Sequence, residues 1–340
     1  LEEFSIVGQK NVSFRDTVAT KELEKITFSA YNDLTVGKLG SGSLLNLSLE
    51  SEFGNLTAAG INATNAKSLD TTINLIAKGT IDNGLDAAFA IDSSSGGINA
   101  TISGGTIQSG PYGAKVNFNV SYPDAGVINL TSTSTNGLLS TITNGGTEDS
   151  NQTSTITLAN VAEEQLNEVT IAGIADNITV IGGTGRDVIQ FKNDNKIKSI
   201  DFNLSTGYDE IDFSNIQNSN GTLLNNGLAI NLSNSSHNVV TGVSVPQGLI
   251  LLGGVNSDVI LNSSVAEFKP SAATGQNLSS EIFGGSLSGI ESITGTAQKD
   301  YLIANSTGTK LNGNAGNDTL IGGIAADELS GGTGNDTISA

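Results

Sequence analysis

The hydrophobic pattern of the chain is most regular in its last fifty residues, where one aliphatic side chain recurs at every ninth position. The series is Ile293, Leu302, Leu311, Leu320, Leu329 and Ile338. An acidic residue stands two positions before most of them, at Glu291, Asp300, Asp318, Asp327 and Asp336. Glycine stands five positions before an aspartate at Gly295, Gly313, Gly322 and Gly331. This period predicts a glycine-permitted turn of six residues followed by a three-residue strand with one inward aliphatic.

Two such units complete one coil of a parallel β-roll, so turns eighteen residues apart stack on the same side. The stacked turns on one side are 295–300, 313–318 and 331–336. Their carboxylates would repel one another unless a hard cation lies between them, and carboxylate and carbonyl oxygens suit calcium. The sequence therefore predicts two inter-turn sites, one between Asp300 and Asp318 and one between Asp318 and Asp336.

The best copies of the repeat, at 313–321 and 331–339, fit the nonapeptide G-G-x-G-x-D-x-U-x, where U is a large aliphatic residue. Residues 182–190 match it in full. In these segments the chain resembles the RTX (repeats-in-toxin) family of secreted calcium-binding proteins. The resemblance implies calcium as the bound ion, an extracellular location and export as an unfolded chain through a type I secretion system.

The candidate calcium ligands are the turn carboxylates and the carbonyl groups at the first and third positions of the better turns. They are Gly182, Thr184, Asp187, Asp209, Asp258, Asp300, Gly313, Ala315, Asp318, Gly322, Ile324, Asp327, Gly331, Thr333 and Asp336. Some turns depart from the repeat: Thr309 stands where aspartate belongs, Ala325 replaces a glycine, and Thr296 and Gln298 replace both inner glycines of the first turn. These departures weaken the predicted sites at the edges of the roll.

The first 150 residues alternate aliphatic side chains with threonine and asparagine in short runs separated by glycine, serine and asparagine. This pattern predicts many short strands with one buried face, beginning near residue 23. A β-solenoid of irregular coils and a β-sandwich both fit. We expect the solenoid, because strands are short and proline and aromatic residues are few. The predicted fold is therefore all-β, a right-handed parallel β-roll or β-solenoid preceded by irregular β segments.

Four segments are expected along the chain. Residues 1–150 form the irregular β-rich segment, and residues 151–216 form a short RTX unit. Residues 199–202 and 209–214 are similar to the strand pair that closes RTX blocks, so a closing hairpin is expected there. Residues 217–270 form an insert rich in Asn, Ser and Gly, with a degenerate repeat that contains Asp258. Residues 271–340 form the C-terminal roll.

Composition narrows the class of partner. The 340 residues contain 15 Lys and Arg against 34 Asp and Glu, a net charge of −19, so a nucleic-acid partner is not expected. Cysteine is absent, which excludes disulfides and Cys zinc sites. The chain begins with leucine, contains no methionine, and stops directly after a repeat strand. We therefore expect it to be a fragment, with a solenoid cap beyond residue 340. The RTX resemblance implies that a C-terminal secretion signal also lies downstream.

No catalytic constellation is visible. The single histidine, His237, lies in the polar run Asn-Ser-Ser-His-Asn and reads as a surface residue. The sequence has no Gly-x-Ser-x-Gly elbow, no His-Glu-x-x-His and no P-loop. Nothing resembles a signal peptide or a transmembrane helix. We do not expect an enzyme.

The chain as a whole looks like the lattice-forming part of an RTX-type surface-layer (S-layer) protein of a Gram-negative bacterium. That resemblance implies self-association into a two-dimensional lattice or oligomer at the cell surface. It also implies attachment to a surface polysaccharide through a region outside this chain. Two alternatives stay open: a calcium-rigidified segment of a large RTX adhesin, and the non-catalytic tail of a secreted hydrolase.

Overall fold

The computed structural model describes most of the chain. The described residues are 3–15, 18–20, 23–41, 43–62, 71–83, 88–93, 98–104, 112–120, 128–134, 136–145, 153–174, 177–192, 199–215, 228–233, 237–240, 243–245, 249–252, 259–261, 268–270 and 283–340. They form strands and turns, and no helix occurs among them. The chain divides into two compact units, which are Leu1–Ala175 with Val180–Asp187 (unit 1) and Asp176–Thr179 with Val188–Ala340 (unit 2).

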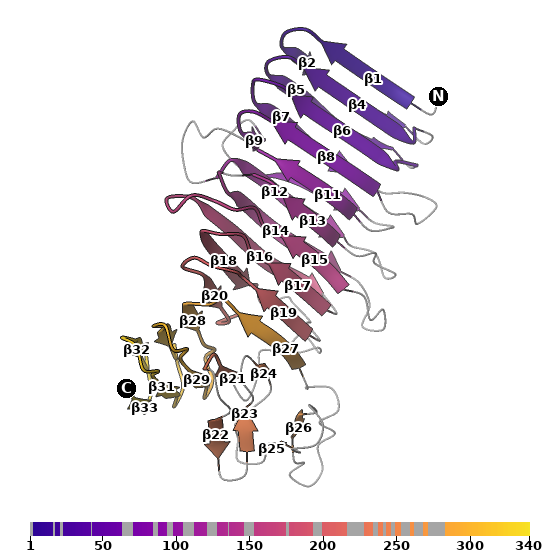
Figure 1. Ribbon diagram of the computed structural model, residues 1–340. Coiled ribbons are helices and arrows are strands. Elements are labelled where there is room, and N and C mark those ends of the chain that lie inside the picture. The colour runs from indigo at the N-terminus through magenta and orange to yellow at the C-terminus, as the bar shows by residue number, and fades with distance from the viewer. Residues whose placement is uncertain are drawn as a thin grey trace. The chain divides into compact units, whose positions relative to one another are not determined.

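Unit 1 is a parallel β-solenoid in which successive strands join two sheets in turn (Figure 1). The first sheet runs β1 (Glu3–Gly8), β4 (Lys25–Ala30), β6 (Asn46–Ser51), β8 (Thr71–Ala77), β11 (Ile98–Ser103), β13 (Ile128–Ser132) and β15 (Thr153–Thr157). The second runs β2 (Val12–Phe14), β5 (Leu34–Ser41), β7 (Leu56–Asn62), β10 (Phe89–Ser93), β12 (Ala114–Val120), β14 (Leu138–Gly145) and β16 (Leu166–Ile174). Two short strands flank the second sheet, β3 (Val18–Thr20) beside β5 and β9 (Ile81–Asp82) beside β7 and β12. Of the two folds left open by the sequence, the solenoid is confirmed.

The core of unit 1 consists of ladders of aliphatic side chains that share one register. Ile26, Leu47, Ile73, Ala100, Leu130 and Ile156 form one ladder across the first sheet. All six are at most 3% exposed. Because side chains alternate between the faces of a strand, the threonine, serine and asparagine between these aliphatics point outward. The alternation of aliphatic and polar residues in the sequence therefore predicts correctly which side chains face the core and which face solvent.

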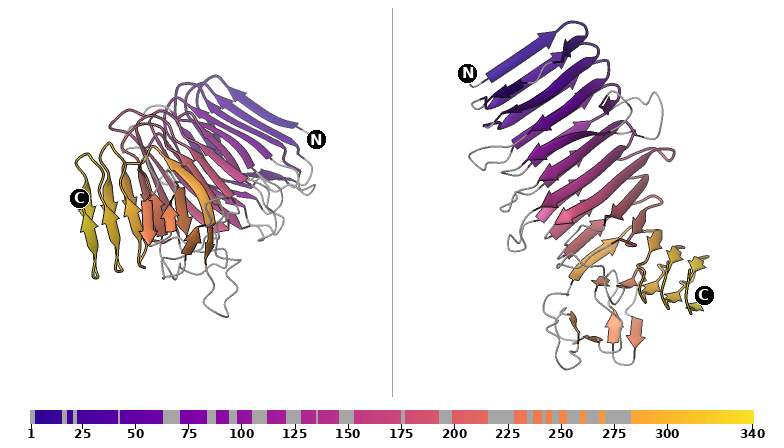
Figure 2. Two further views of the ribbon diagram at one scale, coloured as in Figure 1. Left: turned by 60° about the horizontal axis from the view of Figure 1, so that its bottom comes forward. Right: turned by 180° about the vertical axis from the view of Figure 1, so that it is seen from behind.

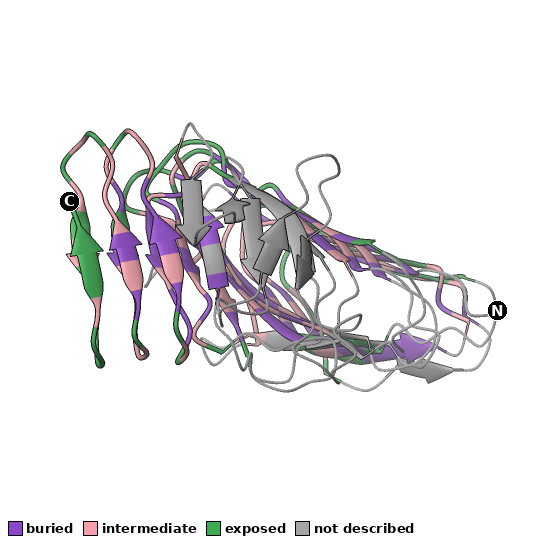
Figure 3. Cartoon of the chain, turned by 90° about the horizontal axis from the view of Figure 1, so that it is seen from below, coloured by how far each residue is buried: buried purple, intermediate pink, exposed green. Residues whose placement is uncertain are grey.

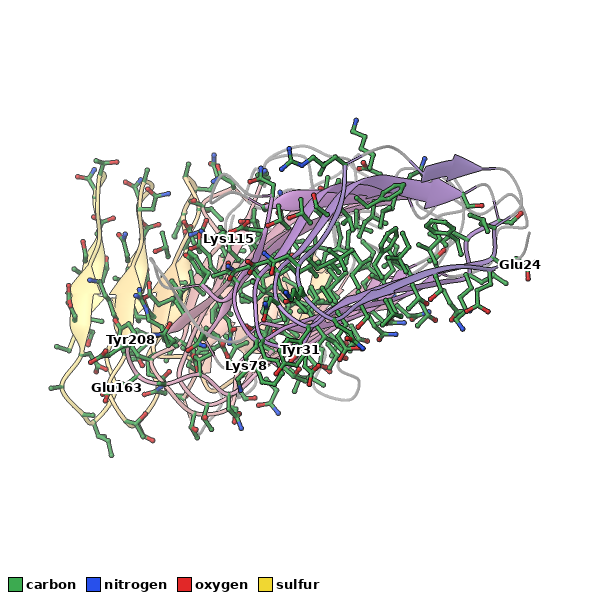
Figure 4. The ribbon with its side chains drawn as sticks, turned by 90° about the horizontal axis from the view of Figure 1, so that it is seen from above. Glu24, Tyr31, Lys78, Lys115, Glu163 and Tyr208 are labelled. Atoms are coloured by element: carbon green, nitrogen blue, oxygen red, sulfur yellow. The ribbon has the colours of Figure 1, made fainter. Side chains whose placement is uncertain are left out.

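Three phenylalanines pack together in the first coils of unit 1. The ring centroid of Phe28 lies 5.7 Å from that of Phe4 and 5.4 Å from that of Phe14. Phe28 is fully buried, whereas Phe4 and Phe14 are partly exposed. Figure 4 shows side chains filling the space between the two sheets.

The turns of the first coils are closed by side-chain amides and carboxylates that accept backbone hydrogen bonds. The N–H of Asn55 donates to Oδ1 of Asp33 at 2.9 Å, and the N–H of Thr80 donates to Oδ1 of Asn55 at 2.9 Å. Gly54 and Gly79 are needed beside them, since a Cβ there would lie 2.5 and 2.2 Å from these same oxygens. In these coils, one side-chain oxygen thus accepts a hydrogen bond from a backbone N–H of the next coil.

Two strands, β17 (Asn177–Ile181) and β18 (Arg186–Phe191), contain the boundaries between the units. In unit 2 the first sheet runs β19 (Ser199–Asn203), β27 (Phe283–Ser288), β24 (Leu249–Leu252), β21 (Leu228–Asn231), β29 (Tyr301–Ile303), β31 (Thr319–Ile321) and β33 (Thr337–Ser339). The second runs β20 (Glu210–Asp212), β28 (Ser292–Thr294), β30 (Lys310–Asn312) and β32 (Glu328–Ser330). Figure 2 shows these ladders from two further directions. Two separate hairpins pair β22 (His237–Val240) with β23 (Val243–Val245) and β25 (Val259–Leu261) with β26 (Phe268–Pro270).

The nine-residue period produces the predicted roll in unit 2. Leu302 pairs with Leu320, and Leu320 with Ile338, in one sheet, while Ile293, Leu311 and Leu329 align in the other. Partners are eighteen residues apart, as two repeats per coil require. Burial declines along the roll, and the last strand, β33, is exposed at all three residues (Figure 3).

The expected closing hairpin between residues 199–202 and 209–214 is wrong. Both strands form, but β19 pairs in parallel with β27, and β20 pairs in parallel with β18 and β28. Consecutive strands of a solenoid lie in opposite sheets, so they cannot pair with each other. The insert also enters the sheet, because β24 pairs antiparallel with both β21 and β27.

Among the described residues, no helix is long and apolar enough to cross a membrane.

Candidate metal centre

On one side of the C-terminal roll, Leu228 is followed by the three stacked aspartates Asp300, Asp318 and Asp336; these four residues are here called the first column. The backbone N–H of each of the first three donates to Oδ1 of the aspartate in the next coil. The distances are 2.7 Å from Leu228 to Asp300, 2.8 Å from Asp300 to Asp318 and 3.0 Å from Asp318 to Asp336. The predicted stacking of these three turns is therefore present, with one carboxylate oxygen of each aspartate directed to the coil before it.

The other oxygen of each carboxylate folds back over the first glycine of its own turn. A Cβ on Gly295, Gly313 or Gly331 would lie 2.3, 2.3 or 2.2 Å from Oδ2 of the aspartate five residues later. The same point above Gly313 is 2.6 Å from the carbonyl oxygen of Gly331 in the next coil. Glycine is required here because the carboxylate and a neighbouring carbonyl occupy the space of a side chain.

Asp318 has the chemistry of a cation ligand. Its side chain is 1% exposed, yet Oδ2 has no hydrogen-bond partner among the described residues. A buried carboxylate oxygen without a partner is costly. Oδ2 and the Gly331 carbonyl oxygen lie 2.3 and 2.6 Å from the same point above Gly313, and oxygen-only donor sets are the sets that calcium prefers. Asp318 and the Gly331 carbonyl fit a calcium ion, which would supply the missing positive charge between the coils.

The turns that contribute these oxygens are in contact along their length. Ala315 and Thr333 form a parallel bridge, and the N–H of Gly316 donates to the carbonyl of Thr333 at 2.9 Å. Together with the Asp318–Asp336 hydrogen bond, this contact holds two sets of predicted calcium ligands side by side in adjacent coils. The first set is Gly313, Ala315 and Asp318, and the second is Gly331, Thr333 and Asp336.

Asp300 differs from Asp318 because both of its carboxylate oxygens receive hydrogen bonds. The N–H of Thr296 donates to Oδ2 of Asp300 at 2.7 Å, and the Thr296 hydroxyl contacts Oδ1 at 3.0 Å. With the bond from Leu228, both oxygens of Asp300 have donors. Oδ2 of Asp300 therefore has a backbone donor and a hydroxyl contact at 3.3 Å, whereas Oδ2 of Asp318 has no partner among the described residues.

The opposite side of the roll carries a second column, comprising Asp209, Glu291, Thr309 and Asp327. The N–H of Asp209 donates to Oε2 of Glu291 at 3.0 Å, and the N–H of Glu291 donates to the Asp209 carbonyl. Glu291 is absent from the ligands predicted above, although it holds the acidic position of the nine-residue series. Its neighbour Asp209 lies 82 residues earlier in the chain, so no local spacing could reveal the pair.

Thr309 and Asp327 form the far end of the second column. The Thr309 hydroxyl accepts the N–H of Asn305 at 3.0 Å, the contact that an aspartate makes elsewhere. Asp327 accepts the N–H of Thr309 at Oδ1 (2.8 Å) and that of Gly323 at Oδ2 (2.6 Å). In the same turn, Gly322 packs near Oδ2 of Asp327, and Ile324 is 93% exposed. Both oxygens of Asp327 are therefore already satisfied.

The remaining predicted residues lie apart from these columns. Asp187 belongs to unit 1, where its Oδ2 accepts the N–H of Gly183, the neighbour of Gly182, at 3.0 Å. The carbonyl of Thr184 accepts the N–H of Val161 at 2.7 Å. Asp258 lies outside the described residues. Within the described part of the chain, no group of three or more His, Cys, Asp or Glu side chains converges on one point, so any calcium site here depends on backbone carbonyls.

Burial raises the pKa of the stacked carboxyl groups. The pKa of Asp300 rises to about 7, mainly by desolvation and with a contribution from the charge of Asp318. The pKa of Asp318 rises to about 6 by desolvation, with a contribution from Asp336. Desolvation likewise raises the pKa of Asp187 to about 7 and raises the pKa of Glu291. Without a cation, the folded columns therefore disfavour the carboxylate form.

We expect the calcium-free roll to become more stable on acidification. Folded Asp300 and Asp318 hold protons that the unfolded chain releases above its aspartate pKa of about 3.9. The free energy of unfolding is therefore largest near or below that pH and falls as pH rises toward 7. Calcium competes with these protons, so its affinity should drop at least about tenfold between pH 7.5 and pH 5. Calorimetric titration at several pH values measures this, and a pH-independent affinity would contradict it.

The fold and turns together define a parallel β-solenoid that ends in a nonapeptide roll. Residues 304–338 match the family described as RTX calcium-binding nonapeptide repeat (4 copies). Such repeats are calcium-binding motifs, and proteins that carry them are typically secreted. A search of curated proteins found no significant match. The match supports an RTX relationship through the C-terminal roll.

Proposed function

We propose that this chain is the structural, lattice-forming part of a calcium-dependent S-layer, exported by a type I system and assembled on the cell surface of a Gram-negative bacterium. The observation that carries the proposal is the first column of the roll. Asp318 holds a buried oxygen without a hydrogen-bond partner among the described residues. Calcium binding there is coupled to folding, so binding free energy becomes folding free energy. The acidic roll would stay unfolded until it meets extracellular calcium.

A lattice also needs a surface through which copies of an acidic chain can approach. Across β6, β8, β11, β13 and β15, ten outward positions of the first sheet form two registered rows, here called the polar face. One row is Asn46, Thr72, Asn99, Asn129 and Thr155, and the other is Ser48, Asn74, Thr101, Thr131 and Thr157. None is charged, although the chain carries −19.

In the first sheet, charged side chains flank this face at Glu3, Lys25 and Glu50. Others occur on the second sheet of the same unit. Lys38, Asp82 and Asp92 lie there, and each is at least partly exposed. The polar face is also ordered within itself, since Nδ2 of Asn129 donates to Oδ1 of Asn99 at 2.9 Å. Two acidic chains repel least where neither presents charge. These features support the polar face as the contact between copies.

Replacing Thr101 by glutamate is expected to prevent calcium-induced assembly. Thr101 is exposed near the middle of the polar face, and the substitution would place a negative charge opposite its copy. Like charges at an interface cost several kcal/mol. Electron microscopy and light scattering after calcium addition would report sheets for the wild-type chain and dispersed particles for the variant, with the circular dichroism of both unchanged.

The matched control is Thr143→Glu, which adds the same charge to β14 in the second sheet. It should assemble as the wild-type chain does. Equal loss in both variants would exclude the polar face as the contact. A wild-type chain that binds calcium and folds but never assembles would contradict the lattice and favour the adhesin segment instead.

A further inference from the structure

The nonapeptide turn of unit 1 is closed by an asparagine. The side chain of Asn167 lies beside Asp187, and its Nδ2 donates to Oδ1 of Asp187 at 2.7 Å. The second carboxylate oxygen, Oδ2, accepts the N–H of Gly183 at 3.0 Å. Asn167 and Asp187 are both 0% exposed. Each oxygen of this buried aspartate therefore has a hydrogen-bond donor from the protein.

The orientation of the Asn167 amide is fixed from both ends. Its Oδ1 accepts the N–H of Leu138 at 3.1 Å, and its Nδ2 also donates to the carbonyl of Ala159 at 3.0 Å. A flipped amide would set its NH2 group against the Leu138 N–H and its oxygen against Asp187 and the Ala159 carbonyl. Asn167 must therefore direct its N–H groups toward Asp187.

The Asp187 and Asp318 turns use the same repeat but differ in what stacks on them. In the first column, Asp318 stacks between two other aspartates, and its Oδ2 has no partner among the described residues. In unit 1, the side chain beside Asp187 is neutral and is itself a donor. An amide N–H thus provides the partial positive charge that a cation would provide between two carboxylates.

We infer that the Asp187 turn is a metal-free form of the nonapeptide turn, in which the Asn167 amide takes the place of calcium, and that unit 1 folds without the ion. This inference rests on the proposed function and specifies which part of the chain depends on calcium to fold. Calcium would then control the coils of residues 291–340 alone. The predicted ligands Gly182, Thr184 and Asp187 do not fit a calcium site.

Two other turns in the described part of unit 1 follow the same principle. Asp33 and Asn55 close the first coils by accepting backbone N–H groups. Neither turn stacks one buried carboxylate on another, so neither leaves a charge that only a cation can balance. In a solenoid, where each coil depends mainly on its neighbours, such coils stay folded at calcium concentrations that leave the acidic coils unfolded.

Hydrogen–deuterium exchange of the full chain, in chelator and in calcium, tests the inference peptide by peptide. Peptides from residues 153–174 should keep the same protection, within about twofold, in both conditions, whereas peptides from 291–340 should gain at least about tenfold with calcium. Protection of 153–174 that depends on calcium would overturn the inference. Loss of the calcium response in 291–340 alone would instead overturn the calcium part of the proposed function.

The decisive variant is Asn167→Asp, which stacks a second carboxylate on Asp187. It should reduce protection of 153–174 at least about tenfold in chelator and restore it in calcium. The control Asn117→Asp makes the same change in β12, where aspartate keeps the hydrogen bond that Oδ1 accepts from the Thr141 N–H, and it should show neither effect in this segment. An Asn167→Asp variant as protected in chelator as the wild-type chain would contradict the role assigned to the amide. If the variant stays unfolded in both conditions, the wild-type comparison decides.

Discussion

Replacing Asp318 by asparagine is expected to abolish the calcium-induced ordering of residues 291–340. Asp318 stands in the middle of the first column, so both predicted inter-turn sites share it. The substitution removes one negative charge and places an NH2 group where the column presents only oxygens. Isothermal titration calorimetry should show at least a tenfold loss of affinity, about 1.4 kcal/mol or more.

Glu328→Gln is the matched control for this variant. It removes the same charge from the same roll, but Glu328 is an exposed strand residue paired with Lys310 at 3.0 Å. Exposed ion pairs contribute about 0–1 kcal/mol, so calcium binding should be nearly unchanged. If the two variants lose affinity equally, net charge and not the turn geometry governs binding.

Replacing Phe28 by alanine is expected to destabilise the first coils of unit 1 by about 3–5 kcal/mol. The ring is fully buried between Phe4 and Phe14, and its loss leaves a cavity that neighbouring backbone cannot fill. Because these coils hold no predicted calcium ligand, the loss should be the same in chelator and in calcium. Hydrogen–deuterium exchange of residues 3–41 would locate the effect, and denaturant unfolding would measure it.

Phe53→Ala provides the comparison for Phe28. Phe53 is 56% exposed and contacts Tyr31 at a centroid distance of 4.7 Å. An exposed aromatic pair contributes about 0.5–1.5 kcal/mol, so this variant should lose far less stability. Similar losses for the two would mean that the first coils have no packed core.

The solenoid could be predicted because it follows from the spacing of residues that are close together in the sequence. An inward aliphatic every nine residues forces two strands per coil, as Leu302 and Leu311 show by joining opposite sheets. The alternation in strands such as β8 likewise predicted which side chains are buried. The expected hairpin of β19 and β20 failed for a related reason. The neighbours of β19 are β17 and β27. Because β27 lies more than eighty residues later, local similarity cannot reveal that pairing.

The site was only partly predictable. Spacing by eighteen residues correctly placed Asp300, Asp318 and Asp336 in one column. It could not show that Thr296 satisfies Asp300, because that depends on turn conformation. Nor could it assign Asn167 to Asp187, since residues 159–167 lack the glycines of the repeat. The donors that satisfy a turn aspartate come from its own turn at Asp300 and from the neighbouring coil at Asp187.

The most direct test of calcium-coupled folding is far-ultraviolet circular dichroism of the chelator-treated full chain during titration with calcium. The β-solenoid of unit 1 should give a β signal before any calcium is added. That signal should then increase saturably as the acidic coils fold, and magnesium at the same concentration should not reproduce the increase. A spectrum that does not change from chelator to saturating calcium would contradict the account.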